Sequence, residues 1–124
     1  MSLATNHTCD AVVVCCIDFR FQQFIRQWTD QHLAGQKFDL IGFAGATKDL
    51  NTVMQQIDLS VKLHHIKRVV LIHHQDCGAY GKDSNLANHT KDLLKAKQTI
   101  LAKYPDLTVD CYYLTLKGEF QPIK

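Results

Sequence analysis

An unbroken apolar run near the start of the chain constrains the fold more than any other feature. The seven residues from Ala11 to Ile17 are all apolar, and several are β-branched. Because a strand with one face in water alternates apolar and polar residues, this run predicts a strand covered on both faces, as in a parallel sheet. It is also far shorter than the ~20 residues that a membrane-spanning helix needs.

Helical and strand-like patterns alternate along the rest of the chain. Residues 78–89, between two of them, are rich in Gly, Ser and Asn and predict a loop. Because alternating strands and helices pair in parallel through right-handed crossovers, we expect one α/β domain over residues 1–124. It would hold an open, mainly parallel four-stranded sheet, in the strand order 2-1-3-4, with helices on both faces. The predicted helices span residues 19–33, 50–65 and 90–104, and the further strands span residues 38–43, 68–73 and 107–116.

Composition narrows the class of protein further. Hydrophobic residues make up 46% of the chain and charged residues 21%, which is typical of a globular domain and not of a disordered one. The net charge of +2 and the lack of a Lys/Arg cluster argue against nucleic-acid binding. Five cysteines, an odd number, without a secretory signal sequence predict free thiols in a reducing compartment. We therefore expect a cytoplasmic protein that binds a small molecule and neither a membrane nor nucleic acid.

Chemically reactive side chains follow the first and third predicted strands. Cys16 comes at the end of the first strand, and His74 and Cys77 come at the end of the third. In the strand order 2-1-3-4 these strands are neighbours, so their carboxyl ends meet where open α/β sheets bind ligands. Two thiolates and one imidazole suit Zn²⁺ and leave its fourth position open, as in catalytic zinc sites. The alternative is that both cysteines are buried as small apolar residues.

These segments resemble the signature of the β-class carbonic anhydrases, which is Cys-x-Asp-x-Arg after the first strand and His-x-x-Cys-Gly after the third. Residues 16–20 read Cys-Ile-Asp-Phe-Arg, and residues 74–78 read His-Gln-Asp-Cys-Gly. The resemblance extends from Ala11 to about Gly118 and includes the order of strands and helices. It implies a zinc-dependent hydro-lyase that interconverts carbon dioxide and bicarbonate, in a homodimer or a higher homo-oligomer.

The resemblance also implies a role for each motif residue. Cys16, His74 and Cys77 would bind zinc, whose bound water would ionise to the hydroxide that attacks carbon dioxide. Asp18 and Arg20 would form the catalytic pair, in which Arg20 holds the carboxylate away from the metal so that it orients the hydroxide. If Arg20 released it, Asp18 would become the fourth metal ligand, an arrangement that the family also uses. Without the resemblance, the same two residues are interpreted as an ordinary surface ion pair.

The chain departs from the family pattern at several positions. His73 stands where the family usually has glycine, and we expect it to line the pocket or shuttle protons, with metal ligation as an alternative. The turn at residues 42–46 reads Gly-Phe-Ala-Gly-Ala in place of Arg-Asn-Ala-Gly-Asn. Only ten residues precede the first strand, so we expect no helical arm around a dimer partner. Two alternatives stay open: a catalytically silent zinc-binding domain, and a hydrolase of carbon disulfide or carbonyl sulfide.

The remaining cysteines have simpler interpretations. Cys15 adjoins Cys16 on a strand, where consecutive side chains point to opposite faces, so we expect it to pack in the core and not to form a redox pair. Cys9 and Cys111 are also predicted to lie in the core. Tyr80 follows the second motif and is predicted to rim the pocket.

Overall fold

The apolar run near the start of the chain forms β1, Ala11–Cys15, inside the sheet. The structure is a computed structural model that describes residues 6–124. All five residues of β1 are buried, as predicted for a strand covered on both faces. The run is longer than the strand, because Cys16 and Ile17 leave the sheet for the loop that follows. The other elements, with η for a short 3-10 helix, are η1 (Phe19–Phe21), α1 (Gln22–His32), β2 (Phe38–Gly42), α2 (Leu50–His64), β3 (Arg68–His74), η2 (Gly81–Asp83), α3 (Leu86–Lys103), β4 (Thr108–Leu114) and β5 (Phe120–Ile123).

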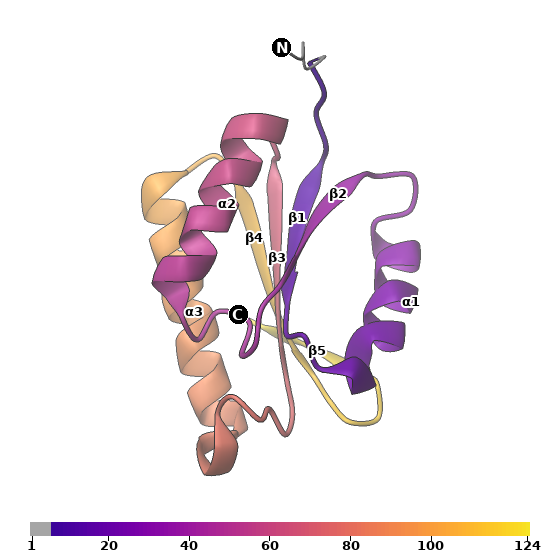
Figure 1. Cartoon of the computed structure of the whole chain (residues 1–124), viewed down its shortest axis with the longest axis vertical. Coiled ribbons are helices and arrows are strands. Elements are labelled where there is room, and N and C mark those ends of the chain that lie inside the picture. Colours follow the sequence, from indigo (N-terminus) through magenta and orange to yellow (C-terminus); the bar gives the residue numbers. More distant parts are fainter. Residues whose placement is uncertain (1–5) are drawn as a thin grey trace, which may run out of the picture.

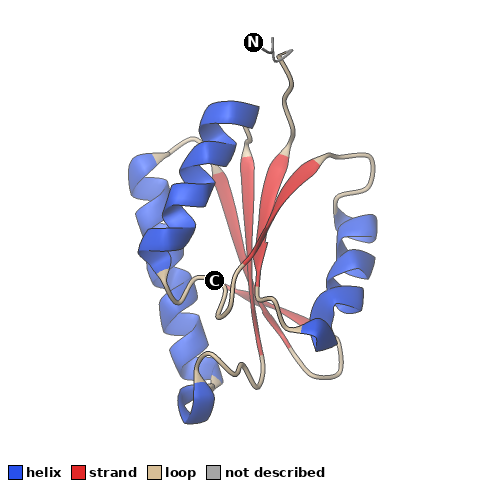
Figure 2. Ribbon diagram, viewed as in Figure 1, coloured by secondary structure: helices blue, strands red, loops and turns tan. Residues whose placement is uncertain are grey.

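The sheet has the strand order β2-β1-β3-β4-β5, which contains the predicted order 2-1-3-4 (Figure 1). β1 pairs in parallel with β2 and β3, and β3 pairs in parallel with β4. Helices cover both faces, with α1 on one and α2 and α3 on the other (Figure 2). The predicted α/β architecture is therefore confirmed.

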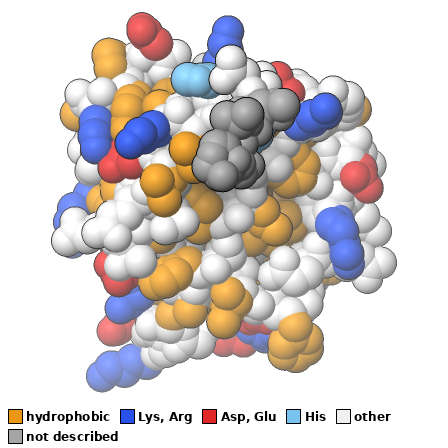
Figure 3. Space-filling model, turned by 45° about the horizontal axis from the view of Figure 1, so that its top comes forward, with side chains coloured by type: hydrophobic (Ala, Val, Ile, Leu, Met, Phe, Trp, Pro, Cys, Tyr) orange, Lys and Arg blue, Asp and Glu red, His pale blue; other side chains and the backbone are white. Residues whose placement is uncertain are grey.

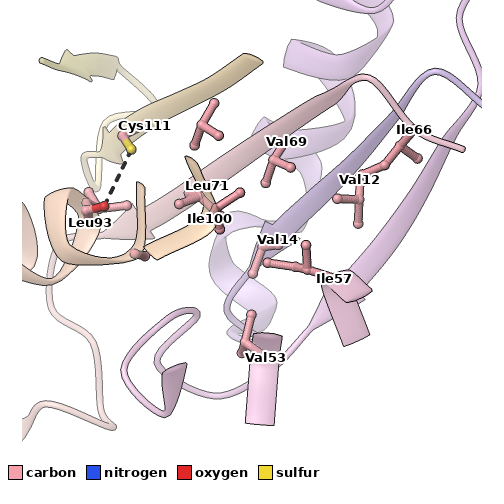
Figure 4. Packing of buried hydrophobic residues seen from close by; sticks show 12 residues of the cluster. Val12, Val14, Val53, Ile57, Ile66, Val69, Leu71, Leu93, Ile100 and Cys111 are labelled. Atoms are coloured by element: carbon pink, nitrogen blue, oxygen red, sulfur yellow. Dashed lines mark hydrogen bonds between the residues drawn. The ribbon is translucent and has the colours of Figure 1, made fainter. Parts of the chain in front are cut away.

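Side-chain alternation along the central strands divides the core into two layers. Val12 and Val14 of β1 face α2 and α3, in the layer drawn in Figure 4. Val13 and Cys15 face the other way and pack with Trp28 of α1. Burying one such valine stabilises the fold by roughly 1.5–3 kcal/mol. The strands that lead into the candidate site are therefore held firmly from both sides.

The prediction of a four-stranded sheet is wrong in one respect, because the chain adds a fifth strand. β5 pairs antiparallel with β4 after a turn in which the Gly118 N–H donates to the Thr115 carbonyl oxygen. Gly118 has a φ of +88°, and a Cβ there would lie 2.7 Å from the Phe24 ring, so this turn requires glycine. β5 is short and contains Pro122, which strands tolerate at a sheet edge. Because β5 is short and contains a proline, its sequence does not predict a strand.

The segment predicted to be a loop, residues 78–89, is partly helical. It contains η2 and the first turn of α3, which begins at Leu86 and not near residue 90. The Asn85 side chain caps α3 by accepting a hydrogen bond of 2.8 Å from the Asn88 backbone N–H. Because asparagine favours both loops and helix caps, composition did not locate this helix start.

Charged side chains are scattered over the surface seen in Figure 3, where Lys and Arg lie among Asp and Glu. That face shows no concentration of basic side chains of the kind that binds nucleic acid. Within residues 6–124, none of the helices is long and apolar enough to cross a membrane.

Candidate metal centre

The carboxyl ends of β1 and β3 bring together three residues from the two sequence motifs. Cys16 follows β1, His74 is the last residue of β3, and Cys77 lies three residues beyond it. All three are buried, and their sulfur and imidazole nitrogen atoms lie within 4.8 Å of one another. The predicted strand order accounts for this convergence, since neighbouring parallel strands end at the same edge of the sheet.

The adjacent residues Cys15 and Cys16 point in opposite directions, as strand alternation predicts. Cys15 packs in the α1 layer, where burial raises the pKa of its thiol to about 11. Cys16 packs against Cys77 and Tyr80 in a small cluster at the strand end. Its sulfur also accepts a hydrogen bond of 3.4 Å from the backbone N–H of Gly45, in the turn after β2. The pair therefore divides into one core thiol and one thiol of the candidate site.

Hydrogen bonding within the cluster shifts the pKa values of its two thiols in opposite directions. The Cys77 thiol donates to Cys16, and this bond lowers the pKa of Cys16. The same bond between the thiols raises the pKa of Cys77. One thiolate is thus stabilised beside a thiol and an imidazole, a donor set that suits Zn²⁺.

His74 presents one ring nitrogen to this cluster. Its Nδ1 lies 2.7 Å from the Gln75 carbonyl oxygen, which can only accept, so Nδ1 carries a hydrogen and, in the neutral ring, Nε2 has a free lone pair. Within residues 6–124, Nε2 is the only buried side-chain nitrogen or oxygen without a hydrogen bond of standard geometry. It faces the Cys16 thiol and lies 3.9 Å from Asp18 Oδ2. This arrangement fits a metal ligand, since metal-bound histidines are oriented by a hydrogen bond on the other nitrogen.

Asp18 and Arg20 form a two-pronged ion pair next to the cluster. Arg20 Nη2 lies 2.7 Å from Asp18 Oδ2, and Arg20 Nε lies 3.1 Å from Oδ1. These hydrogen bonds hold the pKa of Asp18 below its usual value. Arg20 Nη1 also donates to Asp76 Oδ2 at 3.0 Å and so links the loops after β1 and β3. Of the two arrangements considered above, the structure has Asp18 paired with Arg20.

A chain of buried polar side chains runs behind the cluster and ends on Cys77. His73 Nε2 accepts hydrogen bonds from the Thr47 hydroxyl at 2.6 Å and from the Thr47 backbone N–H at 3.3 Å. His73 Nδ1 lies 2.8 Å from His89 Nδ1, and His89 Nε2 lies 2.9 Å from Ser84 Oγ. Ser84 Oγ in turn accepts a hydrogen bond of 2.9 Å from the Cys77 N–H.

The backbone donor at one end decides each proton position along this chain. Because the Thr47 N–H can only donate, His73 Nε2 is unprotonated, and its Nδ1 donates to His89. His89 Nδ1 then accepts, so its Nε2 donates to Ser84. Burial lowers the pKa of His73 to about 3 and that of His89 to about 4, which keeps both rings neutral. The donors and acceptors of these hydrogen bonds are therefore fixed along the whole series, and the series supports the loop that carries Cys77.

His73 thus has a setting that its sequence neighbours do not indicate. Strand alternation sends it to the face of β3 opposite His74, and both of its ring nitrogens are engaged, one by Thr47 and one by His89. This geometry favours a positioning role over pocket lining, proton transfer or metal ligation. The sequence patterns did not identify His89 as a buried residue, because it lies in the segment predicted to be a loop.

Tyr80 joins the cluster to this buried chain. Its side chain packs with Cys16 and Cys77, and its ring lies 4.0 Å from the His89 ring between centroids. Its hydroxyl donates to Asp92 Oδ2 at 2.5 Å. Tyr80 is buried, so it forms part of the wall behind the cluster and not an exposed rim.

The structure as a whole is similar to those of known carbonic anhydrases. The carbonic anhydrase from Glaciozyma antarctica matches with a TM-score of 0.72 and 17% identity, over 99% of this chain and 86% of that chain. A tetrameric β-carbonic anhydrase of Sordaria macrospora matches with a TM-score of 0.57 and 14% identity, over 94% of this chain and 81% of that chain. The apo form of a carbon disulfide hydrolase matches with a TM-score of 0.62 and 15% identity, over 96% and 81%. At these identities the likeness defines the class of fold alone, which is that of the β-carbonic anhydrases.

Comparison at the level of sequence narrows this class to a family. Residues 6–124 match the model of the family described as "Putative carbonic anhydrase". An uncharacterized protein of Rickettsia conorii is 27% identical, over 98% of this chain and 75% of that protein. The chain therefore belongs to this carbonic anhydrase family, as a divergent relative of the β-class enzymes.

Proposed function

We propose that this protein is a zinc-dependent carbonic anhydrase that interconverts carbon dioxide and bicarbonate. The observation that carries the proposal is the unpartnered Nε2 of His74, buried beside Cys16 and Cys77 at the carboxyl edge of a carbonic anhydrase fold. These three residues would hold Zn²⁺ and leave its fourth position open. When bound, zinc lowers the pKa of water and so supplies a nucleophile near neutral pH.

The residues beside the cluster would orient the reacting groups. Asp18 is ionised because Arg20 lowers its pKa, and its Oδ2 lies close to the unpartnered nitrogen of His74. A carboxylate at this position can accept a hydrogen bond from the attacking water and aim its lone pair at the carbon of the substrate. Arg20 would act as a positioning residue, since its two-pronged grip keeps the carboxylate from reaching the metal.

Stopped-flow hydration of carbon dioxide by the zinc-loaded chain, from about pH 6.5 to about pH 9, tests this proposal. We expect a zinc-dependent rate that rises with pH, and we expect Cys77→Ser to lose both zinc and activity. Cys111→Ser is the matched control, because this thiol lies in the core layer that faces α2 and α3, outside the cluster, and donates to the Leu93 carbonyl oxygen. Activity confined to the alkaline end would indicate that Asp18 moves from Arg20 to the metal at neutral pH. Zinc-loaded protein that is inactive at every pH would overturn the proposal and favour a silent zinc-binding domain.

A hydrolase of carbon disulfide or carbonyl sulfide is the second candidate. The segment after β1 exposes two large apolar side chains that closely follow Cys16 along the chain, Ile17 at 63% and Phe19, the first residue of η1, at 86%. An apolar approach to the site suits a linear sulfur analogue of carbon dioxide, and a carbon disulfide hydrolase shares this fold. The test is sulfide release from either substrate, measured against zinc-free protein. Hydration of carbon dioxide without sulfide release would exclude this candidate.

We further propose that the chain forms a homodimer or a higher homo-oligomer in the cytoplasm. β2 is an edge strand, and Leu40 on it is 60% exposed, so an apolar and unpaired edge is available to a second copy. The odd number of cysteines, five, favours free thiols and therefore a reducing compartment. Light scattering during size-exclusion chromatography measures the mass in solution, and Leu40→Glu should lower it to that of one chain. A monomeric wild-type protein would contradict the oligomer.

A further inference from the structure

A second group of metal-ligating side chains lies at the opposite end of the sheet from the first. Cys9 precedes β1, Asp39 lies near the start of β2, and His64 is the last residue of α2. These elements begin or end at the same edge, which is the upper one in Figure 1. The thiol sulfur, a carboxylate oxygen and an imidazole nitrogen lie within 4.8 Å of one another. None of these residues belongs to the two carbonic anhydrase motifs.

Hydrogen bonds hold the three side chains in place. Asp39 Oδ2 accepts from Ser60 Oγ at 2.6 Å and from His64 Nδ1 at 2.7 Å. The Cys9 backbone N–H donates to the His64 carbonyl oxygen at 3.0 Å, which keeps the Cys9 segment against the end of α2. Burial tends to raise the pKa of Asp39, but the hydrogen bonds from Ser60 and His64 outweigh it and the pKa is lowered. The group is therefore ordered, and its carboxylate is negatively charged.

The spacing of these atoms suits a small divalent ion. In a tetrahedral zinc site with ligand bonds of about 2.0–2.3 Å, the ligand atoms lie roughly 3.3–3.8 Å apart. The distance of 2.7 Å between His64 Nδ1 and Asp39 Oδ2 is shorter than this spacing, and the upper limit of 4.8 Å on the separations within the group is longer. Side-chain shifts of about 1 Å therefore convert the group into such a site. Ser60 already donates to Asp39, as groups behind metal-bound carboxylates do. The ring of His7 lies 4.8 Å from the His64 ring between centroids and brings a second imidazole to the group.

We propose that Cys9, Asp39 and His64 form a second site, for a divalent ion of the zinc class, that is independent of the cluster at the carboxyl edge. A thiolate, an imidazole and a carboxylate favour zinc over magnesium and calcium, which take oxygen ligands. An ion can enter through a hollow of about 280 Å³ between β2 and α2, whose walls include Asp39, Ser60 and His64. Binding releases the proton of the Cys9 thiol to solvent and replaces the hydrogen bond between His64 and Asp39 with bonds to the ion, so that a neutral His64 ring carries its proton on the nitrogen that does not bind. The bound ion then links the segment before β1 to β2 and α2, and so stabilises the edge of the sheet at which the parallel strands begin.

Cobalt titration of a variant without the first cluster isolates this site. The full chain with Cys16→Ser and Cys77→Ser retains Cys9, and Co²⁺ bound to a thiolate absorbs in the near ultraviolet. We expect about one equivalent of Co²⁺ with this absorption, displaced by zinc. Adding Asp39→Asn should weaken binding by about tenfold or more, and adding Cys9→Ser should abolish the thiolate absorption. Asp10→Asn is the matched control for Asp39→Asn, because Asp10 is an exposed carboxylate at the same edge and should leave binding unchanged.

Two outcomes refute the second site: no cobalt binding by the double variant at micromolar concentrations, or thiolate absorption that survives Cys9→Ser. If the double variant does not fold, zinc stoichiometry of the otherwise unaltered chain decides the question. We expect Cys9→Ser to bind about one equivalent less than the wild type and Asp10→Asn to bind as much as the wild type. A Cys9→Ser variant that binds as much zinc as the wild type refutes the site. Stoichiometry does not depend on turnover, so the result stands whether or not the chain hydrates carbon dioxide.

Discussion

Replacing His89 should weaken both the fold and the proposed metal centre, because this residue is the middle of the buried hydrogen-bond chain. His89→Leu removes the acceptor for the His73 Nδ1–H and the donor to Ser84 Oγ. A buried donor left without a partner costs about 1–3 kcal/mol, and the lost bond to Ser84 costs about 1 kcal/mol. We therefore expect the free energy of unfolding to fall by about 2–4 kcal/mol. For a chain of this length, that corresponds to a drop in Tm of roughly 8–16 °C.

Urea and thermal unfolding of the zinc-free protein measure this cost. His89→Gln is the conservative variant, since its amide can accept from His73 and donate to Ser84, and we expect it to recover at least half of the loss. Lys95→Leu is the control, because Lys95 is exposed on the same helix and its replacement should change stability by less than about 0.5 kcal/mol. A His89→Leu cost within that range, or a His89→Gln variant no more stable than His89→Leu, would refute the reasoning.

Zinc affinity is a second measurement of the effect of His89. A general loss of stability would not lower the zinc affinity of protein that is still folded. Without His89, Ser84 is no longer held against the Cys77 N–H, and the loop that carries this thiol loses its support. We expect the zinc affinity of folded His89→Leu to fall by about 10–100-fold, with recovery in His89→Gln. Competition with a chromophoric chelator, at a temperature where both variants are folded, measures the difference.

Three further predictions concern pH, the ion pair and the last turn. Because the pKa of buried His89 is lowered to about 4, the unfolded chain binds more protons than the folded chain between about pH 6.5 and pH 4, so stability falls on acidification. His89→Gln should make this fall shallower by about 1 kcal/mol per pH unit in urea unfolding, and an unchanged slope would contradict it. Arg20→Lys removes the two-pronged ion pair with Asp18. The rate of carbon dioxide hydration at pH 7 should therefore fall by about tenfold or more, and the activity should shift to alkaline pH. An unaltered pH profile would show that Arg20 does not position the carboxylate. Gly118→Ala should cost about 1–3 kcal/mol, because its φ is positive and its Cβ meets Phe24, whereas Gly78→Ala has open space and should cost little; equal effects in unfolding experiments would count against this explanation.

Much of the candidate site follows from local patterns in the sequence. The apolar run at Ala11–Ile17 requires a buried strand, and strand alternation sends Cys15 and Cys16 to opposite faces. Alternating strands and helices imply parallel neighbours, whose carboxyl ends share one edge of the sheet. These rules bring Cys16 and His74 together although they are far apart along the chain, because topology and not packing detail decides which strand ends meet.

Contacts between side chains of different elements depend on tertiary structure alone. Periodicity says which face of an element a residue occupies but not which residue it meets, because that depends on how helices and loops dock on the sheet. The bond between His73 and His89 requires α3 to begin four residues earlier than its composition suggests. The bridge from Arg20 to Asp76 requires two loops to meet beyond the sheet. The composition of the chain and its two motifs thus determine the class of fold and the metal-ligand candidates, whereas packing decides which groups support them and what gathers at the opposite edge.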